Sequence, residues 1–385
     1  MCVGFHYQDD QMKVLTVFGT RPEAIKMAPV VKVLLNNPRF ETKVCVTAQH
    51  RSMLDQVLSL YKITPHYDFN IMAANQSLTH ILNYVMQGLE EVLDRFKPDW
   101  VLVQGDTTTT FAASLAAFHK KIAVGHIEAG LRTRQLYSPW PEEMNRQLTT
   151  RIASLHFAPT GLAKTNLLAE CVREEKIIVT GNTVIDALLE IANYLQTNPA
   201  VIATMEKHFS FLDKKCKLLL VTSHRRENFG AGLMQVCHAL LELASREDVQ
   251  IVYPVHLNPN VLGPVHQLLG KQKNIHLLPP QDYLPFVYLM MRSYLIITDS
   301  GGIQEEAPSL GKPVLVVRET TERQEGIAAG TAKLVGTNQS SIVKHVEVLL
   351  DNSTLYETMS AALNPYGDGK AAERIMRKLQ DECNL

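Results

Sequence analysis

The most informative segment of the chain is SYLIITDSGGIQEEA, residues 293–307. Its apolar beginning, residues 293–298, predicts a short buried strand, and the run after Gly302 is compatible with a helix. A Ser-Gly-Gly turn between a strand and a helix leaves backbone N–H groups free at the helix start. The helix dipole adds about half a positive charge at the same place.

This turn favours a nucleotide-binding site. Because Ser300 is followed by Gly301 and Gly302, which lack side chains, a phosphate can approach the backbone closely. Glu306 would lie one turn into the helix, where a carboxylate can accept hydrogen bonds from ribose hydroxyls. The alternative is a glycine turn followed by a solvated helix.

Composition restricts the function classes. The chain has 385 residues, enough for two domains, with 46% hydrophobic and 20% charged residues. A formal charge of −1 argues against a broad basic face for nucleic acid. No apolar run approaches the roughly 20 residues that span a bilayer. Residues 1–11 lack the apolar core of a secretory signal, and we expect them to be a loose extension without a part in the chemistry. The six cysteines form no CxxC pair, which fits a reducing, cytoplasmic location.

Strands and helices alternate along the first half. This alternation predicts an α/β fold, a parallel sheet with right-handed crossovers. The expected strands are 14–18, 43–47, 100–104, 122–126 and 154–158, and the expected helices are 23–36, 50–60, 77–96, 108–120 and 142–152. In an open parallel sheet, ligands bind at the carboxyl ends of the strands.

The same alternation returns after a less ordered stretch at about 196–215. The expected strands there are 217–222, 249–254, 274–278, 294–298 and 313–317, each followed by a helix. We therefore predict two doubly wound, Rossmann-like domains, residues 12–195 and 196–368, with a cleft between them. Residues 369–385 would form an amphipathic helix that crosses back to the first domain.

Two cations follow the first strand. Arg21 and Lys26 would lie near the N-terminus of the helix that begins at Pro22, a suitable place for a diphosphate. They could equally be surface residues. The segment is not GxGxxG, and no Walker A loop occurs, so nicotinamide binding and P-loop hydrolysis lose support.

Three carboxylates, Asp106, Glu128 and Glu142, are candidates for acid/base work. Each has a structural alternative: Asp106 could cap the next helix, Glu128 could pair with Arg132, and Glu142 could serve the dipole of its helix. Carboxylates that face one cleft shift each other's pKa, so that one can hold a proton while another accepts one.

The second half adds a histidine and further cations. His224 ends a predicted strand, where it can donate to a phosphate, shuttle a proton or simply cap the strand. Arg318 and Arg323 add positive charge near the glycine turn, and His256 fits a structural or regulatory role. No metal-ligand spacing such as HxH or HExxH is present, and no cofactor is expected.

Seven ordered blocks resemble the non-hydrolysing UDP-N-acetylglucosamine 2-epimerases, from Met12 almost to the end of the chain. They are FGTRPEAIKMAP at 18–29, GDTTTT at 105–110, HIEAGLRT at 126–133, SPWPEEMNR at 138–146, HRRENFG at 224–230, DSGGIQEEAPSLGKPVLV at 299–316 and NPYGDG at 364–369. The resemblance implies the glycosyltransferase-B arrangement of two Rossmann-like domains, usually as a homodimer.

The resemblance also implies roles for individual residues. Acid/base catalysis would fall to Asp106, Glu128 and Glu142, with His224 assisting the UDP leaving group. Substrate contacts would come from Arg21, Lys26, Arg146, Phe286, Ser300, Gly301, Gly302, Glu306 and Arg323. A second UDP-N-acetylglucosamine, acting as an allosteric activator, would contact Gln49, Gln76, Arg226 and His256.

The implied reaction interconverts UDP-N-acetylglucosamine and UDP-N-acetylmannosamine, by anti elimination of UDP to 2-acetamidoglucal and re-addition, for cell-surface polysaccharide synthesis. Three alternatives stay open at this point: a hydrolysing relative, a UDP-sugar glycosyltransferase of the same architecture, and a catalytically silent nucleotide-sugar sensor. Transfer needs at most one base, so the three carboxylates favour the epimerase over the glycosyltransferase.

Overall fold

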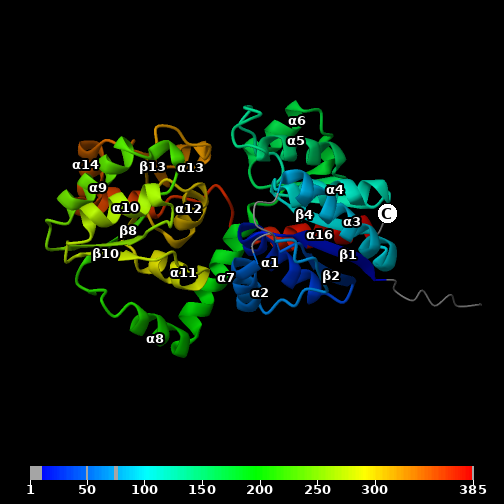
Figure 1. The fold of residues 1–385 in the computed structure, drawn as a ribbon, viewed down its shortest axis with the longest axis horizontal. Coiled ribbons are helices and arrows are strands. Elements are labelled where there is room, and N and C mark those ends of the chain that lie inside the picture. Colours follow the sequence, from blue (N-terminus) through cyan, green and yellow to red (C-terminus); the bar gives the residue numbers. More distant parts are fainter. Residues whose placement is uncertain (1–10, 49–50, 73–76, 384–385) are drawn as a thin grey trace, which may run out of the picture. The chain divides into compact units, whose positions relative to one another are not determined.

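In a computed structural model of the protein, residues 11–48, 51–72 and 77–383 are described. Their contacts divide the chain into two compact units, one ending at Ala187 and resumed at Gly367, the other formed by Leu188–Tyr366. Each unit contains one parallel sheet with helices on both of its faces (Figure 1). The predicted α/β class is therefore confirmed.

The sheet of the first unit has seven parallel strands within the described residues, in the order β3-β2-β1-β4-β5-β6-β7. The strands are β1 (Met12–Phe18), β2 (Phe40–Val46), β3 (Tyr67–Asp68), β4 (Trp100–Gln104), β5 (Ala123–Ile127), β6 (Leu155–Ala158) and β7 (Ile177–Val179). The helices are α1 (Arg21–Leu35), α2 (Arg51–Tyr61), α3 (Leu78–Phe96), α4 (Thr108–His119), α5 (Glu142–Ile152), α6 (Gly161–Ala169) and α16 (Ala371–Cys383). Helix α7 (Thr183–Thr197) begins in the first unit and continues into the second.

The sheet of the second unit has six parallel strands within the described residues, in the order β10-β9-β8-β11-β12-β13. They are β8 (Lys217–Thr222), β9 (Val249–Pro254), β10 (Ile275–Leu278), β11 (Leu295–Thr298), β12 (Val314–Val316) and β13 (Ala332–Leu334). The helices are α8 (Pro199–His208), α9 (Ala231–Leu243), α10 (Pro259–Leu269), α11 (Tyr283–Arg292), α12 (Gly301–Glu306), α13 (Gln324–Ala328), α14 (Gln339–Asp351) and α15 (Ser353–Ser360).

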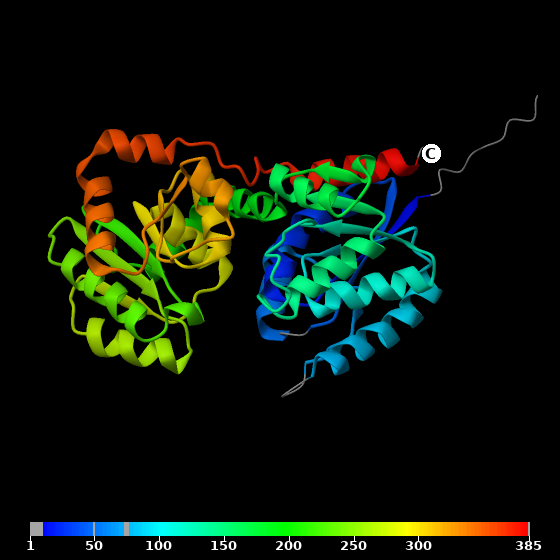
Figure 2. The ribbon, with the colours of Figure 1, turned by 90° about the horizontal axis from the view of Figure 1, so that it is seen from above.

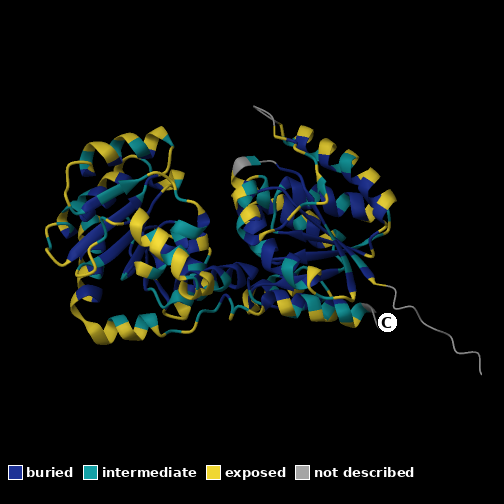
Figure 3. Ribbon diagram, turned by 90° about the horizontal axis from the view of Figure 1, so that it is seen from below, coloured by how far each residue is buried: buried dark blue, intermediate teal, exposed yellow. Residues whose placement is uncertain are grey.

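Both cores lie between sheet and helices. Figure 3 shows the strands buried and the outer faces of the helices exposed. Leu15, Leu89 and Val101 belong to the core of the first unit, and Val221, Leu240 and Ile297 to that of the second. Each central strand is apolar on both faces because helices cover both sides of a parallel sheet, which explains the continuous apolar runs in the sequence.

The final helix packs against the first one in the same unit (Figure 2). The Asp186 carboxylate accepts hydrogen bonds from the backbone N–H groups of Ala371 (3.2 Å) and Ala372 (2.9 Å) at the start of α16. Further along, the Asn37 amide lies 3.3 Å from the sulfur of Met376. The chain therefore returns to its first unit after completing the second.

The stretch at about 196–215 is more regular than predicted. It contains α8, which begins with Pro199 in the first turn and is capped by the Asn198 side chain, an acceptor for the Val201 N–H at 3.4 Å. No residue of α8 is buried, so the sequence shows no apolar stripe there. In the described part of the chain, no helix is long and apolar enough to cross a membrane.

Candidate active site

Both sheets place the candidate residues where the strand order reverses. In the first unit the reversal lies between β1 and β4, and the segments after β1, β4 and β5 carry the predicted residues. In the second unit it lies between β8 and β11, which are followed by His224 and by the Ser300 turn. Ligands bind at such switch points because the crossovers on either side diverge and leave a crevice.

The turn after β1 is held by a buried carboxylate. Glu23 accepts hydrogen bonds from the backbone N–H groups of Gly19 (3.0 Å) and Thr20 (2.7 Å) and from the Thr107 (2.6 Å) and Thr110 (3.2 Å) hydroxyls. Burial raises the pKa of Glu23, and these hydrogen bonds oppose that rise. Glu23 thus ties the start of α1, where Arg21 lies, to the start of α4.

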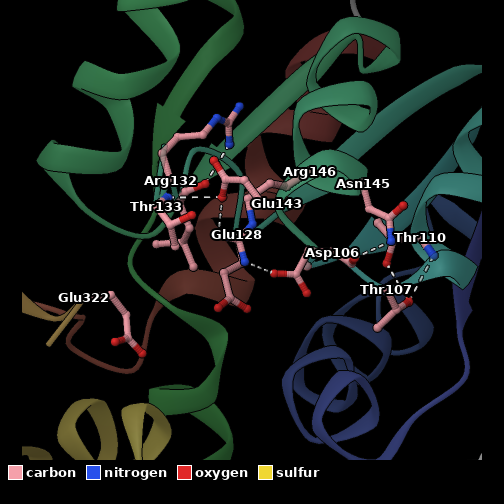
Figure 4. A network of polar contacts seen from close by, with 12 residues as sticks. Asp106, Thr107, Thr110, Glu128, Arg132, Thr133, Glu143, Asn145, Arg146 and Glu322 are labelled. Carbon is pink, nitrogen blue, oxygen red and sulfur yellow. Dashed lines mark hydrogen bonds and ion pairs between the residues drawn. The ribbon is translucent and has the colours of Figure 1, made fainter. Parts of the chain in front are cut away.

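Asp106 follows β4 and is held from α5. The Arg146 guanidinium donates to the Asp106 carboxylate, and the Asn145 side chain donates to the Asp106 backbone oxygen at 3.0 Å. The other arm of Arg146 donates to Glu143 at 3.0 Å (Figure 4). The capping alternative for Asp106 is wrong, because Thr107 is the residue whose side chain caps α4.

Glu143 is fully buried and accepts further bonds beyond that from Arg146. The backbone N–H groups of Thr133 (3.1 Å) and Arg134 (3.2 Å) donate to it, as does the Gln147 amide at 3.1 Å. A buried carboxylate with this many donors is stable because each lone pair that lost water has gained a protein partner. Glu143 therefore fixes Arg146, and through it the carboxylate of Asp106.

Glu128 follows β5 in a left-handed backbone conformation, with φ of 64°. Its carboxylate is buried and accepts from Lys26 Nζ at 2.5 Å and from the Gln104 amide. Two residues on, Gly130 has φ of 93°, and a Cβ there would lie 2.3 Å from the backbone oxygen of Ala163. This glycine allows the turn that carries Glu128 to pack against α6.

The expected alternative for Glu128, an ion pair with Arg132, is wrong. Arg132 instead donates to Glu170 at 2.6 and 2.9 Å and to the Thr150 hydroxyl at 2.9 Å. Arg132 therefore fastens α5 and α6 together, and Glu128 is paired with Lys26.

Glu142 is the first residue of α5, where a carboxylate interacts favourably with the helix dipole, the alternative role expected from the sequence. Its Oε2 atom is buried, and no hydrogen bond reaches it from the described residues. Glu143 and Glu142 thus differ sharply: the Glu143 carboxylate accepts several hydrogen bonds, and Glu142 has a buried oxygen without a partner among the described residues. Because most buried polar atoms in proteins are hydrogen-bonded, this oxygen is an exception, and a catalytic role is one of the explanations for such an exception.

Two buried histidines, His126 and His156, lie on the neighbouring strands β5 and β6. His126 and His156 face each other in the strand register, and the His126 Nε2 atom lies 2.7 Å from the Gly105 carbonyl oxygen. Burial lowers the pKa of His126 to about 4 and that of His156 to about 3. Both histidines are therefore neutral structural groups near pH 7.

In the second unit, Asp299 organises the segment after β8. It is fully buried, and its Oδ2 atom accepts from the Ser223 hydroxyl, the His224 and Arg225 N–H groups (each 2.9 Å) and the Asn228 amide (3.1 Å). The segment that carries His224 is thereby fastened to the residue before the Ser300 turn.

His224 and His256, predicted for different roles, lie together. Their rings stack with centroids 5.6 Å apart, and both residues are exposed. Arg226, in the short helix 226–228, is exposed as well. Of the proposed allosteric contacts, Gln49 and Gln76 lie outside the described residues.

The Ser300 turn is close to an arginine. A Cβ on Gly301 would lie 3.1 Å from Glu322 Oε1 and 3.2 Å from Arg323 Cζ, whereas Gly302 has more space. Farther along α12, Glu306 accepts a hydrogen bond of 3.0 Å from the Tyr283 hydroxyl of α11. Phe286, also on α11, is half-buried.

A network of charges surrounds this turn. Arg323 donates to Glu305 at 2.8 Å and lies 3.2 Å from Glu322, which also accepts from Arg318 at 2.7 Å. Burial disfavours the charged form of Glu322, but Arg323 and Arg318 outweigh burial and lower its pKa to about 2. The positive charge of these arginines is thus partly balanced within the unit.

The sequence did not single out Glu23, Gln104, Glu143 or Asp299. Signals existed for two of them. Thr20 and Glu23 have capping-box spacing, and Glu143 lies three residues before Arg146 on one helical face. Among the described residues, no group of three or more histidine, cysteine, aspartate or glutamate side chains gathers in a way that could hold a metal ion.

A comparison with known families decides where the chain belongs. Residues 32–380 match the model of a family described as UDP-N-acetylglucosamine 2-epimerase. The chain belongs to the UDP-N-acetylglucosamine 2-epimerase family. Membership places it among the isomerases.

Individual members of this family are similar over nearly the whole chain. UDP-N-acetylglucosamine 2-epimerase of Escherichia coli K12 is 58% identical over 371 residues, covering 96% of this chain and 99% of that protein. The Salmonella typhimurium enzyme is 59% identical over 370 residues, covering 96% and 98%. The crystal structure of the Neisseria meningitidis enzyme bound to UDP-GlcNAc is 56% identical, with a TM-score of 0.89 and coverage of 96% and 100%.

Proposed function

We propose that this protein interconverts UDP-N-acetylglucosamine and UDP-N-acetylmannosamine without hydrolysis. The observation that carries the proposal is a set of three carboxylates: Asp106 follows β4 at the switch point, Glu128 follows the neighbouring strand β5, and Glu142 begins α5. Asp106 and Glu128 each accept from a cation, and Glu142 keeps a buried oxygen without a described partner. Membership of the family supports UDP-N-acetylglucosamine as the substrate.

The reaction needs acids and bases on both faces of the sugar. The C2 hydrogen is not adjacent to a carbonyl, so direct deprotonation is prohibitive. If UDP leaves from C1 as a base removes the C2 proton, the product is 2-acetamidoglucal. A proton delivered to the opposite face of C2, with UDP returning to C1, gives the epimer. Each positioned acid or base contributes roughly 10²–10⁴ in rate.

The first unit supplies the acid/base groups in this proposal, and the second holds the nucleotide. The Ser300 turn and Arg323 would bind the diphosphate, and Glu306 the ribose hydroxyls. His224 would stabilise the charge that develops on the departing UDP. Two of these groups also have protein partners, which a substrate would share or replace: Tyr283 donates to Glu306, and Arg323 donates to Glu305.

Proton NMR of UDP-N-acetylglucosamine incubated with the protein, without an acceptor, tests this proposal. We expect UDP-N-acetylmannosamine to accumulate until both nucleotide sugars coexist at equilibrium. Free N-acetylmannosamine with stoichiometric UDP would identify a hydrolysing enzyme. Turnover only after an acceptor is added would identify a glycosyltransferase, and an unchanged spectrum would identify a sensor. Glu174→Gln, which alters an exposed ion pair with Lys164, is the control variant and should match the wild type.

We further propose that the enzyme acts in the cytoplasm as a homodimer, supplying a sugar donor for surface polysaccharide. A second UDP-N-acetylglucosamine would activate it through Arg226 and His256. Light scattering after gel filtration measures the oligomeric state, and a monomer at assay concentration would contradict the dimer. Initial rates of the reverse reaction, with and without added UDP-N-acetylglucosamine, test activation.

A further inference from the structure

Asp299 uses its two carboxylate oxygens differently. Oδ2 accepts four hydrogen bonds, which close the end of β8 against the end of β11. Oδ1 is buried and accepts no hydrogen bond from the described residues, and the nearest charged partner recorded for it is the Nδ1 atom of His224, at 3.4 Å. One oxygen therefore fulfils the structural role, and the other faces an imidazole.

The His224 ring is confined by its neighbours. His256 stacks on it at 5.6 Å, and the charged groups that act on it are Asp299, Arg225 and His256. With Nδ1 directed to Asp299, Nε2 is the nitrogen left for a ligand, and 40% of the side chain is exposed. Desolvation lowers the pKa of His224, and the Asp299 carboxylate opposes that shift.

We propose that Asp299 is a positioning residue for His224: its Oδ1 holds the proton on Nδ1 and so presents Nε2 to the UDP leaving group. The proposal rests on the proposed function, because it assigns His224 to the departure of UDP. The distance of 3.4 Å is longer than a normal hydrogen bond, but catalytic hydrogen bonds often shorten when substrate binds.

The chemical step balances within this arrangement. As the C1–O bond breaks, its electron pair passes to the β-phosphate oxygen of UDP. The imidazolium form of His224 donates its Nε2–H to that oxygen, while Nδ1–H donates to Asp299. On re-addition the oxygen returns its electron pair to C1, and the hydrogen bond to Nε2 relaxes. Asp299 remains a carboxylate throughout.

Asp299→Asn distinguishes the positioning role from a purely structural role of Asp299. In Asp299→Asn, the amide oxygen can still accept the four hydrogen bonds that Oδ2 accepts now. Only the group facing His224 changes, from an acceptor to an NH₂ donor. That donor binds an unprotonated Nδ1, so the neutral ring would carry its proton on Nε2 and the imidazolium would be disfavoured. The variant ring can then offer a neutral Nε2–H, but it lacks the positive charge that opposes the charge developing on the departing oxygen.

The test combines kinetics with NMR of the full-length protein. We expect Asp299→Asn to lower kcat about 10²-fold or more while KM changes less than about threefold. In the His224→Ala background, Asp299→Asn should have no further effect on kcat, because the residue acts through the ring. Asp186→Asn, which alters another carboxylate that accepts backbone N–H groups, is the matched control and should keep wild-type kcat.

Nitrogen NMR of labelled protein, wild type and Asp299→Asn, supplies a readout that needs no turnover. We expect the neutral His224 ring to be protonated on Nδ1, and on Nε2 in Asp299→Asn. Multiplicative losses of kcat in the double variant, or an Nε2–H tautomer in the wild type, would overturn the proposal. Because the tautomer is measured without substrate, it separates this inference from the proposed function: a protein that does not epimerise would refute only the latter.

Discussion

Lys26 Nζ donates a hydrogen bond of 2.5 Å to Glu128 across 102 residues of sequence. The two side chains come from α1 and from the turn after β5, on either side of β4. The sequence predicted Lys26 as a ligand of the diphosphate. In the structure its partner is Glu128, a proposed acid/base group, and the two roles predict different changes in kcat and KM.

Replacement of Lys26 by methionine separates the roles. We expect kcat to fall at least tenfold with a small change in KM, because Glu128 loses the cation that orients it and keeps Gln104 as its other described donor. Steady-state kinetics with UDP-N-acetylglucosamine measure both constants. A large rise in KM with unchanged kcat would instead assign Lys26 to the diphosphate. Lys32→Met, on the same helix, is the control.

The neighbouring glutamates of α5 should respond in opposite ways. Glu142→Gln is expected to keep or slightly raise the melting temperature, since its Oε2 atom has no described partner, while kcat falls about 10²–10⁴-fold. Glu143→Gln should lower the free energy of unfolding by about 3 kcal/mol, because it leaves the buried Arg146 with an impaired partner.

Thermal unfolding followed by circular dichroism, together with kcat at saturating substrate, checks both glutamate variants. Equal losses of stability in the two would show that Glu142 is as much a structural residue as Glu143. Wild-type kcat in Glu142→Gln would remove Glu142 from the proposed acid/base set.

Acid should destabilise the first unit through its buried histidines. The pKa values of His126 and His156 fall from 6.5 to about 4 and about 3, so the unfolded chain binds more protons than the folded chain between those values and 6.5. The stability present above pH 6.5 is therefore lost as pH falls towards 4. Lowering the pH from 7.5 to 5 should reduce the free energy of unfolding by on the order of 2 kcal/mol for each histidine.

Urea unfolding at several pH values measures the slope of the free energy of unfolding against pH. His126→Gln should reduce it by about half, whereas His80→Gln, at an exposed position on α3, should leave it unchanged. A slope in His126→Gln equal to that of the wild type would mean that other groups cause the acid sensitivity.

Gly130 should not tolerate a side chain. Its φ is 93°, and a Cβ would lie 2.3 Å from the Ala163 backbone oxygen. Gly130→Ala should therefore lower the free energy of unfolding by about 2–4 kcal/mol. Gly161→Ala is the matched variant, because a Cβ there meets nothing within 4 Å. Similar melting temperatures for the two variants would show that the turn after β5 rearranges freely.

The sequence predicted most of the fold because apolar strands and amphipathic helices leave strong periodic signals. It missed β3, β7 and β13, which have two or three residues each and so carry almost no pattern. It also missed α6, α7 and α8. No residue of α8 is buried, so that helix has no apolar stripe to reveal it.

The candidate site was predicted in part. Asp106, Glu128 and His224 follow strands, and a strand end is visible in sequence. Their partners come from segments far apart in the chain, such as Arg146 for Asp106, 40 residues away, and Asp299 for His224. Sequence spacing carries no information on such pairs, so the alternative partners for Asp106 and Glu128 could not be separated until the structure was known.

Solvent deuterium incorporation at C2 of the sugar tests the central claim most directly, since the proposed carboxylates must exchange that proton. Wild-type enzyme in heavy water should place deuterium at C2 of both nucleotide sugars, as observed by proton NMR and mass spectrometry. The double variant Asp106→Asn, Glu142→Gln should leave C2 protonated while the fold survives. Epimerisation without deuterium at C2, or full exchange by the double variant, would contradict the account.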